Sequence, residues 1–461
     1  MKRISFSGIT VLILSITIIW VSFNICNWKN PDSVIAWDVK SYYAYLPATF
    51  IYKDLTFSFR QDKPEYSDWF WPFTAPNGGL VIITSMGMSM LYSPFFFLAH
   101  GYTIMTSPEE ATGFSKPYAF MLVMSTIFYA SVGLIFLRKL LLRFFNDTVS
   151  TFVIIAVFLG TNLFCYSTTH SVMSHAYSFC LITIFILFTD RWYDHPNVKN
   201  SIVLGLTGGL ISLIRPTNII VVVLFIFWNW HGYSEIRTRL QLFYKKGLMI
   251  LIIILTAFLI WLPQLIYWKS ITGHWLYYSY GPDNQFFFNN PQWFKVLFSF
   301  RNGWFIYSPI MFVAVAGIAF MIKNYKIIFF PVLIYFILNV YIVSSWWCWW
   351  YGGSFGLRAF IDSYAVYALP LGVVFQRTFP VKKIYRYCLF SLYLILIIIC
   401  QFFSYKYRYG SIHFDSMTHE ALFDSFWRLK PSKTFYKKLK TPDYDLARKG
   451  IYEKDYKNKT K

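Results

Sequence analysis

Long runs of apolar residues recur along this 461-residue chain and constrain its fold more than any other feature. An apolar stretch of about 20 residues can cross the hydrocarbon core of a bilayer as a helix. Charged residues make up only 14% of the chain, against about 25% in soluble domains, so the sequence predicts an all-α integral membrane protein. Nine apolar stretches are long enough to cross a membrane: 8–26, 118–137, 149–167, 171–189, 247–268, 305–322, 327–345, 359–376 and 387–403.

Two further apolar stretches are interrupted by proline, at Pro94 within 80–105 and at Arg215-Pro216 within 201–230. Proline breaks helices because it lacks an amide hydrogen and its ring clashes with the preceding turn. We interpret 80–105 as a re-entrant or surface-lying pair of helices and 201–230 as a hairpin whose tip is Arg215-Pro216. The chain then has about eleven transmembrane helices, and the first is expected to remain uncleaved.

The distribution of Lys and Arg predicts the orientation, because these residues gather on the cytoplasmic side. With the N-terminus inside, the segments predicted to be cytoplasmic hold 17 of the 42 Lys and Arg residues. If both interrupted stretches cross once instead, the chain again has eleven spans, but residues 106–200 are inverted and a basic cluster moves outside. The cytoplasmic segments of the preferred arrangement are 1–7, 138–147, 190–200, 231–246, 323–326 and 377–386.

Both arrangements place the same four segments on the outer face: 27–79, 269–304, 346–358 and 404–461. The chain therefore divides into a transmembrane domain, 1–403, and an extracytoplasmic tail, 404–461. The first outer loop of the transmembrane domain, 27–117, is expected to contain the re-entrant or juxtamembrane helices. Within the tail, residues 410–429 are expected to form one amphipathic helix.

The first outer loop places an acid, Asp38, among aromatic residues that include Trp37, Tyr42 and Tyr43. A carboxylate that is partly desolvated near the membrane surface can act as a general base. The alternative is an ordinary solvated acid, as expected for the other acids of this loop.

Two arginines are candidates for binding phosphate. Arg215 lies in an apolar stretch, where a charge is costly unless it faces a cavity or pairs with an anion, although it could also extend to the headgroups. Arg358 follows a Trp-rich segment, 346–350, and glycines that permit close backbone approach, and its guanidinium can hold phosphate with two hydrogen bonds. Trp349 is a candidate ligand contact or part of an interfacial belt, and Asp362 is interpreted as the ion-pair partner of Arg358.

Three further residues on the predicted outer face have two interpretations each. His170 and His175 could donate to phosphate or sugar hydroxyls, or be ordinary interfacial histidines, and Arg301 has a similar pair of interpretations. The two histidines are five residues apart, whereas metal ligands on one helical face are usually four apart. Because the sequence has no C-x-x-C pair and no phosphate-binding glycine motif, we expect no cofactor, no essential divalent metal and no nucleic-acid partner.

Two motifs carry a resemblance to a known family. The segment DVKSYYAYLP, 38–47, follows one long helix and opens the first outer loop, and WWYGGSFGLR, 349–358, comes late in the chain. This layout resembles the GT-C superfamily of lipid-dependent glycosyltransferases, which includes protein O-mannosyltransferases and the aminoarabinose transferase of lipid A. In such enzymes the first-loop acid is the proposed base. Many O-mannosyltransferases pair two adjacent acids, whereas Asp38 is followed by Val39 and Lys40.

The resemblance implies an inverting transfer of a sugar from a polyprenyl-phosphate donor to a hydroxyl of a glycan, lipid or protein. The reaction would occur at the outer face of a bacterial cytoplasmic membrane, in glycan biosynthesis for the cell envelope. The alternative is a flippase or transporter of lipid-linked saccharides whose arginines line the path. In the first interpretation Asp38 is the general base, and the substrate-binding residues are Lys40, Tyr42, Tyr43, His170, His175, Arg215, Arg301, Trp349 and Arg358.

Overall fold

The computed structural model describes residues 5–59, 67–230, 232 and 235–452. The regular structure of these residues is helical except for one short hairpin, in which β1 (Phe73–Thr74) pairs antiparallel with β2 (Leu80–Val81). The chain forms two compact units. Unit 1 comprises Met1–Thr10, Leu141–Cys165 and Gly281–Lys461, and unit 2 comprises Val11–Leu140 and Tyr166–Tyr280.

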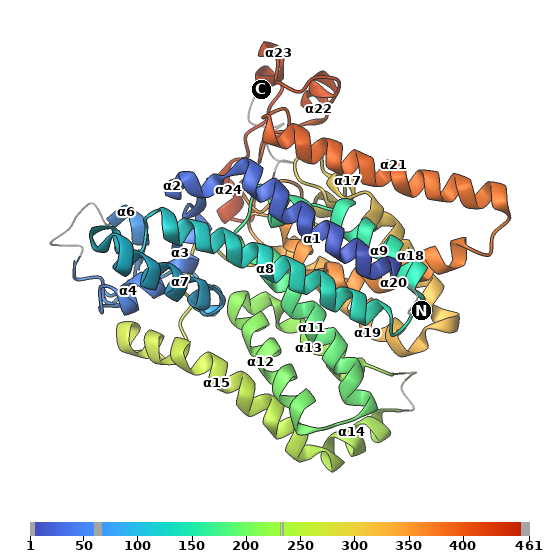
Figure 1. Ribbon diagram of the computed structural model, residues 1–461, viewed down its shortest axis with the longest axis horizontal. Helices are drawn as coiled ribbons and strands as arrows, with labels where there is room; N and C mark the ends of the chain where they lie inside the picture. The colour runs from blue at the N-terminus through green and yellow to red at the C-terminus, as the bar shows by residue number, and fades with distance from the viewer. Residues whose placement is uncertain (1–4, 60–66, 231, 233–234, 453–461) are drawn as a thin grey trace. The chain divides into compact units, whose positions relative to one another are not determined.

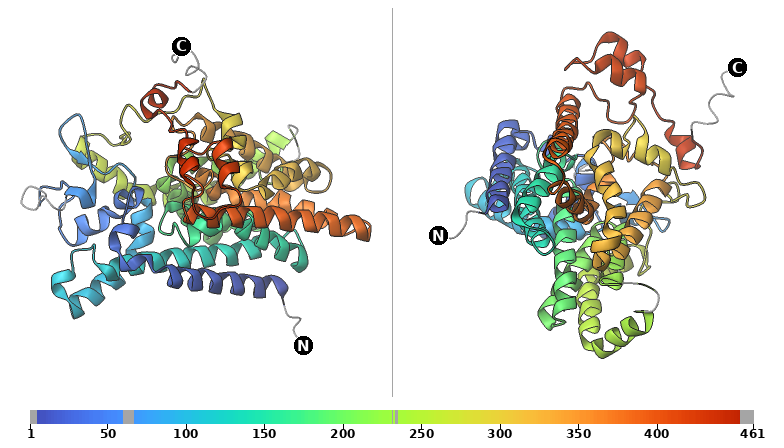
Figure 2. Two further views of the ribbon diagram at one scale, coloured as in Figure 1. Left: turned by 90° about the horizontal axis from the view of Figure 1, so that it is seen from above. Right: turned by 90° about the vertical axis from the view of Figure 1, so that its right-hand side faces the viewer.

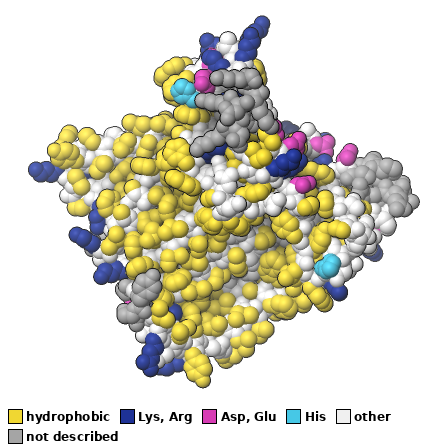
Figure 3. Space-filling view, turned by 180° about the vertical axis from the view of Figure 1, so that it is seen from behind, with side chains coloured by type: hydrophobic (Ala, Val, Ile, Leu, Met, Phe, Trp, Pro, Cys, Tyr) yellow, Lys and Arg dark blue, Asp and Glu magenta, His cyan; other side chains and the backbone are white. Residues whose placement is uncertain are grey.

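Six helices among the described residues are long and apolar enough to cross a membrane. Hydrophobic side chains dominate the face shown in Figure 3, and such a surface requires lipid rather than water around it. The protein is therefore helical with membrane character, while the count of eleven spans stays a prediction. The six are α1 (Phe6–Ile25), α8 (Lys116–Leu141), α15 (Gly247–Thr272), α19 (Lys326–Ser345), η6 (Arg358–Ser363) with α20 (Tyr364–Thr378), and α21 (Lys383–Arg408).

Unit 2 contains the predicted hairpin. The helix α12 (Val198–Ile214) ends at Arg215, whose backbone is extended, and η4 (Pro216–Val221) and α13 (Val222–Phe227) follow. Both ends of the hairpin meet the same residue of α11 (Ser174–Asp194): Trp192 donates to Ser201 Oγ over 3.0 Å, and its ring lies 5.0 Å from the ring of Phe225. The chain therefore reverses at Arg215-Pro216, as predicted.

Glycines allow α12 to lie directly against α15 (Figure 1). A Cβ atom at Gly205 would lie 1.7 Å from Thr256 Oγ1 and 2.4 Å from the carbonyl oxygen of Ile253, and one at Gly209 would lie 3.0 Å from the backbone of Ala257. Small residues four apart permit such close approach between helices in membranes.

Residues 80–105 do not form a pair of helices, which corrects the prediction. The first two belong to β2, and α7 (Gly87–Thr106) continues through Pro94 as one helix. The proline removes the amide that would bond the Met90 carbonyl, but Ser93 Oγ donates to that oxygen over 2.8 Å. A local side chain thus compensates the lost hydrogen bond, and the helix survives.

Unit 2 has one further helix of moderate length, α14 (Ile236–Lys245). Its remaining elements are short: η1 (Asn27–Lys29), α2 (Pro31–Val34), α3 (Asp38–Tyr43), α4 (Tyr45–Phe50), α6 (Ser67–Phe70) and η3 (Pro108–Glu110). Segment 82–86 is fixed against α15, because the Ile82 amide donates to the Tyr267 hydroxyl over 3.0 Å and the Met86 amide donates to Gln264 Oε1 over 2.7 Å.

Unit 1 is built around α20. The helix α18 (Ile310–Asn324) packs closely on it, since a Cβ at Gly317 would lie 2.4 Å from the Pro370 carbonyl oxygen. The stretch predicted as one span, 149–167, is interrupted instead: α9 (Asp147–Leu159) stops before Gly160, and α10 (Leu163–Ser167) is separate. Asn162, in this break, donates to the Phe355 carbonyl over 3.0 Å and accepts from the Tyr364 hydroxyl over 2.6 Å.

The tail after α21 consists of short helices joined by extended chain (Figure 2). The expected amphipathic helix over 410–429 is not formed, because only α22 (His419–Ser425) is helical there. Its start is fixed by Thr418, whose hydroxyl accepts from the Ala421 amide. The remaining short elements of unit 1 are α16 (Trp293–Phe298), α17 (Trp304–Tyr307), α23 (Lys433–Lys437) and α24 (Tyr444–Arg448).

Candidate functional site

Asp38 is the first residue of α3 and is partly exposed. Trp37, directly before it, has a positive φ of 49° and is 76% exposed. Positive φ is unfavourable for a residue with a large side chain, and such strain is concentrated at functional sites. The chain thus adopts an uncommon backbone conformation at the point where it presents Asp38.

The neighbours of Asp38 on α3 have different environments. Lys40 donates to the Asp68 carbonyl over 2.7 Å, and Tyr43 is buried and donates to the Gly113 carbonyl over 2.6 Å. Tyr42, which is also buried, lies with its hydroxyl 3.4 Å from Ser174 Oγ. Lys40 and Tyr43 therefore hold α3 in place through backbone carbonyls, whereas Tyr42 contacts the first residue of α11.

Tyr280 marks the place where Asp38 and Arg215 come together. Burial raises the pKa of the Tyr280 hydroxyl, Tyr42 and Asp38 raise it further, and the positive charge of Arg215 lowers it. The ring keeps some exposed surface, but its hydroxyl is surrounded by protein. Asp38, Tyr42 and Arg215 therefore share the electrostatic environment of the Tyr280 hydroxyl. Tyr280 was not among the residues predicted from the sequence, although it ends an aromatic run, WLYYSY, at 275–280.

The hairpin tip is held in position by the chain around it. Trp261 of α15 donates to Ser212 Oγ over 3.0 Å, and Ser85 Oγ donates to the Leu213 carbonyl. The backbone turns back at once, since the Asn218 amide donates to the Arg215 carbonyl over 2.8 Å. Arg215 itself is partly exposed, so the helix break presents a guanidinium at the edge of the apolar region.

An apolar groove of about 350 Å³ begins beside Arg215. Ser212 and Ile219, on either side of the break, line one part of it, and Gly205, Phe225 and Phe258 line the rest. The groove is bounded by α11, α12, α13 and α15. Its lining is apolar, and Arg215 lies in the chain between two of the lining residues, Ser212 and Ile219.

The two histidines lie on either side of Tyr166. The ring of His170 is 5.8 Å and that of His175 is 5.1 Å from the tyrosine ring. His175 is 1% exposed, in the first turn of α11, whereas His170 is partly exposed. Of this pair, only His170 has surface open to a ligand.

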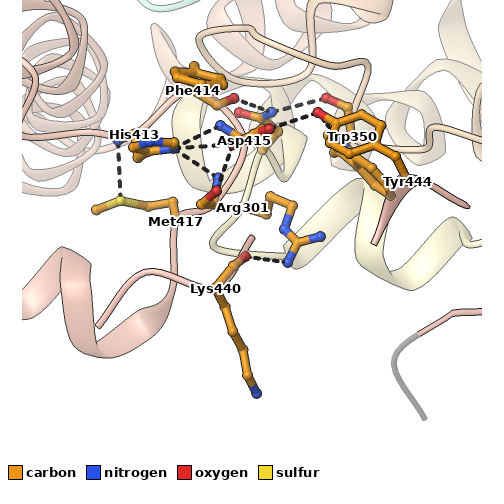
Figure 4. A network of polar contacts seen from close by, with 10 residues as sticks. Arg301, Trp350, His413, Phe414, Asp415, Met417, Lys440 and Tyr444 are labelled. Carbon is orange, nitrogen blue, oxygen red and sulfur yellow. Dashed lines mark hydrogen bonds and ion pairs between the residues drawn. The ribbon is translucent and has the colours of Figure 1, made fainter. Parts of the chain in front are cut away.

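Unit 1 holds the other predicted residues. Arg301 is 5% exposed, donates to the Lys440 carbonyl over 2.9 Å, and lies over the rings of Trp349 and Trp350 at 5.9 and 5.3 Å (Figure 4). Trp349 is only 2% exposed, and Lys295 Nζ lies 5.8 Å from the centre of its ring. The Trp-rich segment is therefore covered by protein, and Arg301 connects it to the tail.

Asp415 organises the tail against this segment (Figure 4). Its carboxylate accepts from Ser416 Oγ and from the Tyr444 hydroxyl, each over 2.7 Å, and lies 3.2 Å from His413 Nδ1. Burial raises the pKa of Asp415, but these contacts outweigh burial and lower it. Nδ1 of His413 accepts the Ser416 amide over 3.1 Å, so it forms an ion pair with Asp415 only when the ring is protonated.

Arg358 and Asp362 both lie on η6. Asp362 is fully buried and Arg358 is partly exposed. The Cys348 thiol is affected by both Arg358 and Asp415: burial raises its pKa to about 12, Arg358 lowers it and Asp415 raises it. Gly356 has a φ of 60°, and a Cβ there would lie 2.8 Å from Tyr307 Cβ, so this glycine permits packing within the protein.

A comparison with protein-family models and a search of curated proteins found no match to this chain. The fold and the composition define a helical membrane protein. Of the predicted site residues, Asp38, Tyr42 and Arg215 are brought together in unit 2. Arg301, Trp349 and Arg358 lie in unit 1.

Proposed function

We propose that this protein is a membrane glycosyltransferase that moves a sugar from a polyprenyl-phosphate donor to an acceptor hydroxyl. The observation that carries the proposal is that a carboxylate, Asp38, and a cation, Arg215, both act electrostatically on the Tyr280 hydroxyl, while residues on either side of Arg215 line an apolar groove. A donor of this class needs these three features, because it has a reacting sugar, a phosphate leaving group and a lipid tail.

The groups fit one inverting displacement. The acceptor hydroxyl transfers its proton to the Asp38 carboxylate as its oxygen bonds the anomeric carbon. The bond from that carbon to the phosphate oxygen breaks, and the phosphate leaves with the electron pair. Arg215 offsets the charge that develops on the phosphate. Tyr280, whose hydroxyl stays protonated, can donate a hydrogen bond to the same oxygens.

The test is Asp38→Asn, expressed in a strain that lacks the gene. We expect the deletion strain to accumulate a glycan lacking one sugar, measured by mass spectrometry, and wild-type protein to restore it. General base catalysis contributes about 10²–10⁴-fold, so Asp38→Asn should lower the transfer rate by at least about 10²-fold. The amount and thermal stability of the variant should stay near wild type.

Asp32→Asn is the matched control, because Asp32 is an exposed acid of the same unit. Asp54 is unsuitable, since its carboxylate accepts hydrogen bonds from the amides and hydroxyls of Thr56 and Ser58. Full restoration by Asp38→Asn would refute the assignment of the base. Complete glycan retained on the cytoplasmic face of the deletion strain would identify the protein as a flippase instead.

A further inference from the structure

The helix α14 carries an exposed apolar stripe that the proposed reaction does not use. Ile236, Leu240 and Tyr244 are four residues apart, so they lie on one face, and they are 44%, 63% and 88% exposed. Leu248, four residues further on in α15, is 65% exposed and continues the series. Three of the ten residues of α14 are basic: Arg237, Arg239 and Lys245.

The face of α14 beside this stripe is fixed to unit 2. Arg239 is 8% exposed, donates to the carbonyls of Trp228 and Asn229, and lies 4.6 Å over the ring of Tyr193. The ring of Phe243 stacks on that of Phe225 at 5.9 Å. These contacts fix the rotation of the helix, and the stripe beside them remains exposed.

Basic residues border the stripe. Arg237, Lys245 and Lys246 are exposed, and Glu235, just before the helix, is the one acid within 235–248. A helix that combines exposed apolar residues with adjacent Lys and Arg lies in the plane of the bilayer surface, with its apolar residues at the boundary of the acyl chains. Its basic residues then meet the phosphates of anionic lipids.

The position of α14 fits such a surface. It ends just before Gly247, the first residue of α15, which is one of the long apolar helices (Figure 1). Its contacts with Tyr193, Phe225 and Trp228 place it at the open end of the α12–α13 hairpin, whereas Arg215 is at the tip. Within unit 2, α14 and Arg215 are thus at opposite ends of the hairpin.

We propose that α14 binds anionic phospholipid on the face of the membrane opposite Arg215. Ile236, Leu240 and Tyr244 enter the acyl boundary, and Arg237, Lys245 and Lys246 bind the lipid phosphates. This inference rests on the membrane character of the fold and is independent of the proposed glycosyl transfer.

The depth of the stripe can be measured by fluorescence quenching. Leu240→Cys is labelled with an environment-sensitive dye in a background with Cys26→Ser and Cys388→Ser, and the protein is placed in nanodiscs containing lipids with a nitroxide on the acyl chain. We expect strong quenching at position 240 and weak quenching for Thr238→Cys, an exposed residue off the stripe. Equal quenching at both positions, or protection of 240 by a second copy seen as a dimer in the nanodisc, would overturn the proposal.

The lipid headgroup is tested with the variant Arg237→Gln/Lys245→Gln/Lys246→Gln. Wild-type and variant protein are equilibrated with equal amounts of phosphatidylglycerol and phosphatidylcholine, and the lipids retained are measured by native mass spectrometry. Each basic residue near a surface contributes about fivefold to anionic lipid binding, so the variant should lose most of the preference for phosphatidylglycerol. An unchanged preference would show that anionic lipid binds elsewhere and would refute the role of these three residues.

Discussion

Substituting Gly205 by alanine should separate α12 from α15. The added Cβ would lie 2.4 Å from the Ile253 carbonyl oxygen and 1.7 Å from Thr256 Oγ1. The threonine is held by its own hydrogen bond to the Ile252 carbonyl over 2.7 Å, and the Ile253 oxygen belongs to the backbone. Neither neighbour can move away without displacing the helix.

The magnitude follows from two opposing effects. Overpacking costs about 1–3 kcal/mol, and contacts this short place Gly205→Ala at the upper end. Alanine improves helix propensity over glycine by up to about 1 kcal/mol. The free energy of unfolding should therefore fall by about 2 kcal/mol. Since Gly205 lines the apolar groove, donor binding should weaken as well.

The assay is unfolding in detergent micelles, followed by tryptophan fluorescence as the fraction of denaturing detergent rises. Gly101→Ala is the matched control, because Gly101 lies inside α7 and a Cβ there meets nothing within 4 Å. It should stabilise the protein by up to about 1 kcal/mol. If Gly205→Ala proves as stable as Gly101→Ala, the close approach of α12 and α15 is wrong.

Two further predictions concern charged residues. Burial raises the pKa of Asp54, but hydrogen bonds from Ser58 and Thr56 outweigh it and lower the pKa to about 2. This folded-state pKa lies below the unfolded value, so the ionised carboxylate stabilises the fold fully above about pH 4. The stabilisation is lost as the pH falls toward 2. The variant Asp54→Asn should therefore show a smaller decrease of the thermal midpoint with falling pH than the wild type. Arg215→Lys should recover only part of the donor affinity that Arg215→Ala loses, because lysine cannot form two parallel hydrogen bonds with phosphate, and wild-type affinity in the alanine variant would assign Arg215 a structural role.

The sequence predicted best those helices that depend only on residues close together in the chain. The stretches 118–137, 247–268, 327–345 and 387–403 fall inside long helices, because an apolar run of that length must satisfy its own backbone hydrogen bonds in lipid. The reversal at Arg215-Pro216 was also predictable, since proline ends α12 there. In contrast, Pro94 does not break α7, because the neighbouring Ser93 bonds the freed carbonyl, and proline alone does not reveal such compensation.

The candidate site was only partly predictable. Asp38 and Arg215 were identified by residue type and position, but their grouping around Tyr280 depends on contacts between segments far apart in the sequence. Contacts between distant segments also explain why the prediction for the Trp-rich segment differs from the structure. Four tryptophans in five residues suggest an exposed belt, whereas Trp349 is buried because Arg301 and the tail cover it.

The discontinuity of unit 1 has a consequence for how the chain is made. Asn162 donates to the Phe355 carbonyl, 193 residues further along the chain, and Trp350 donates to the Tyr444 hydroxyl, which lies 94 residues after that tryptophan. Since a protein emerges from the ribosome N-terminal end first, α9 is made long before its partners in unit 1, and the second part of unit 2, Tyr166–Tyr280, is made in between. The Asn162 amide therefore cannot form these hydrogen bonds until the later segments of unit 1 are made. The order of synthesis makes unit 1 the last to assemble, and truncation before Tyr444 should leave its outer part unfinished.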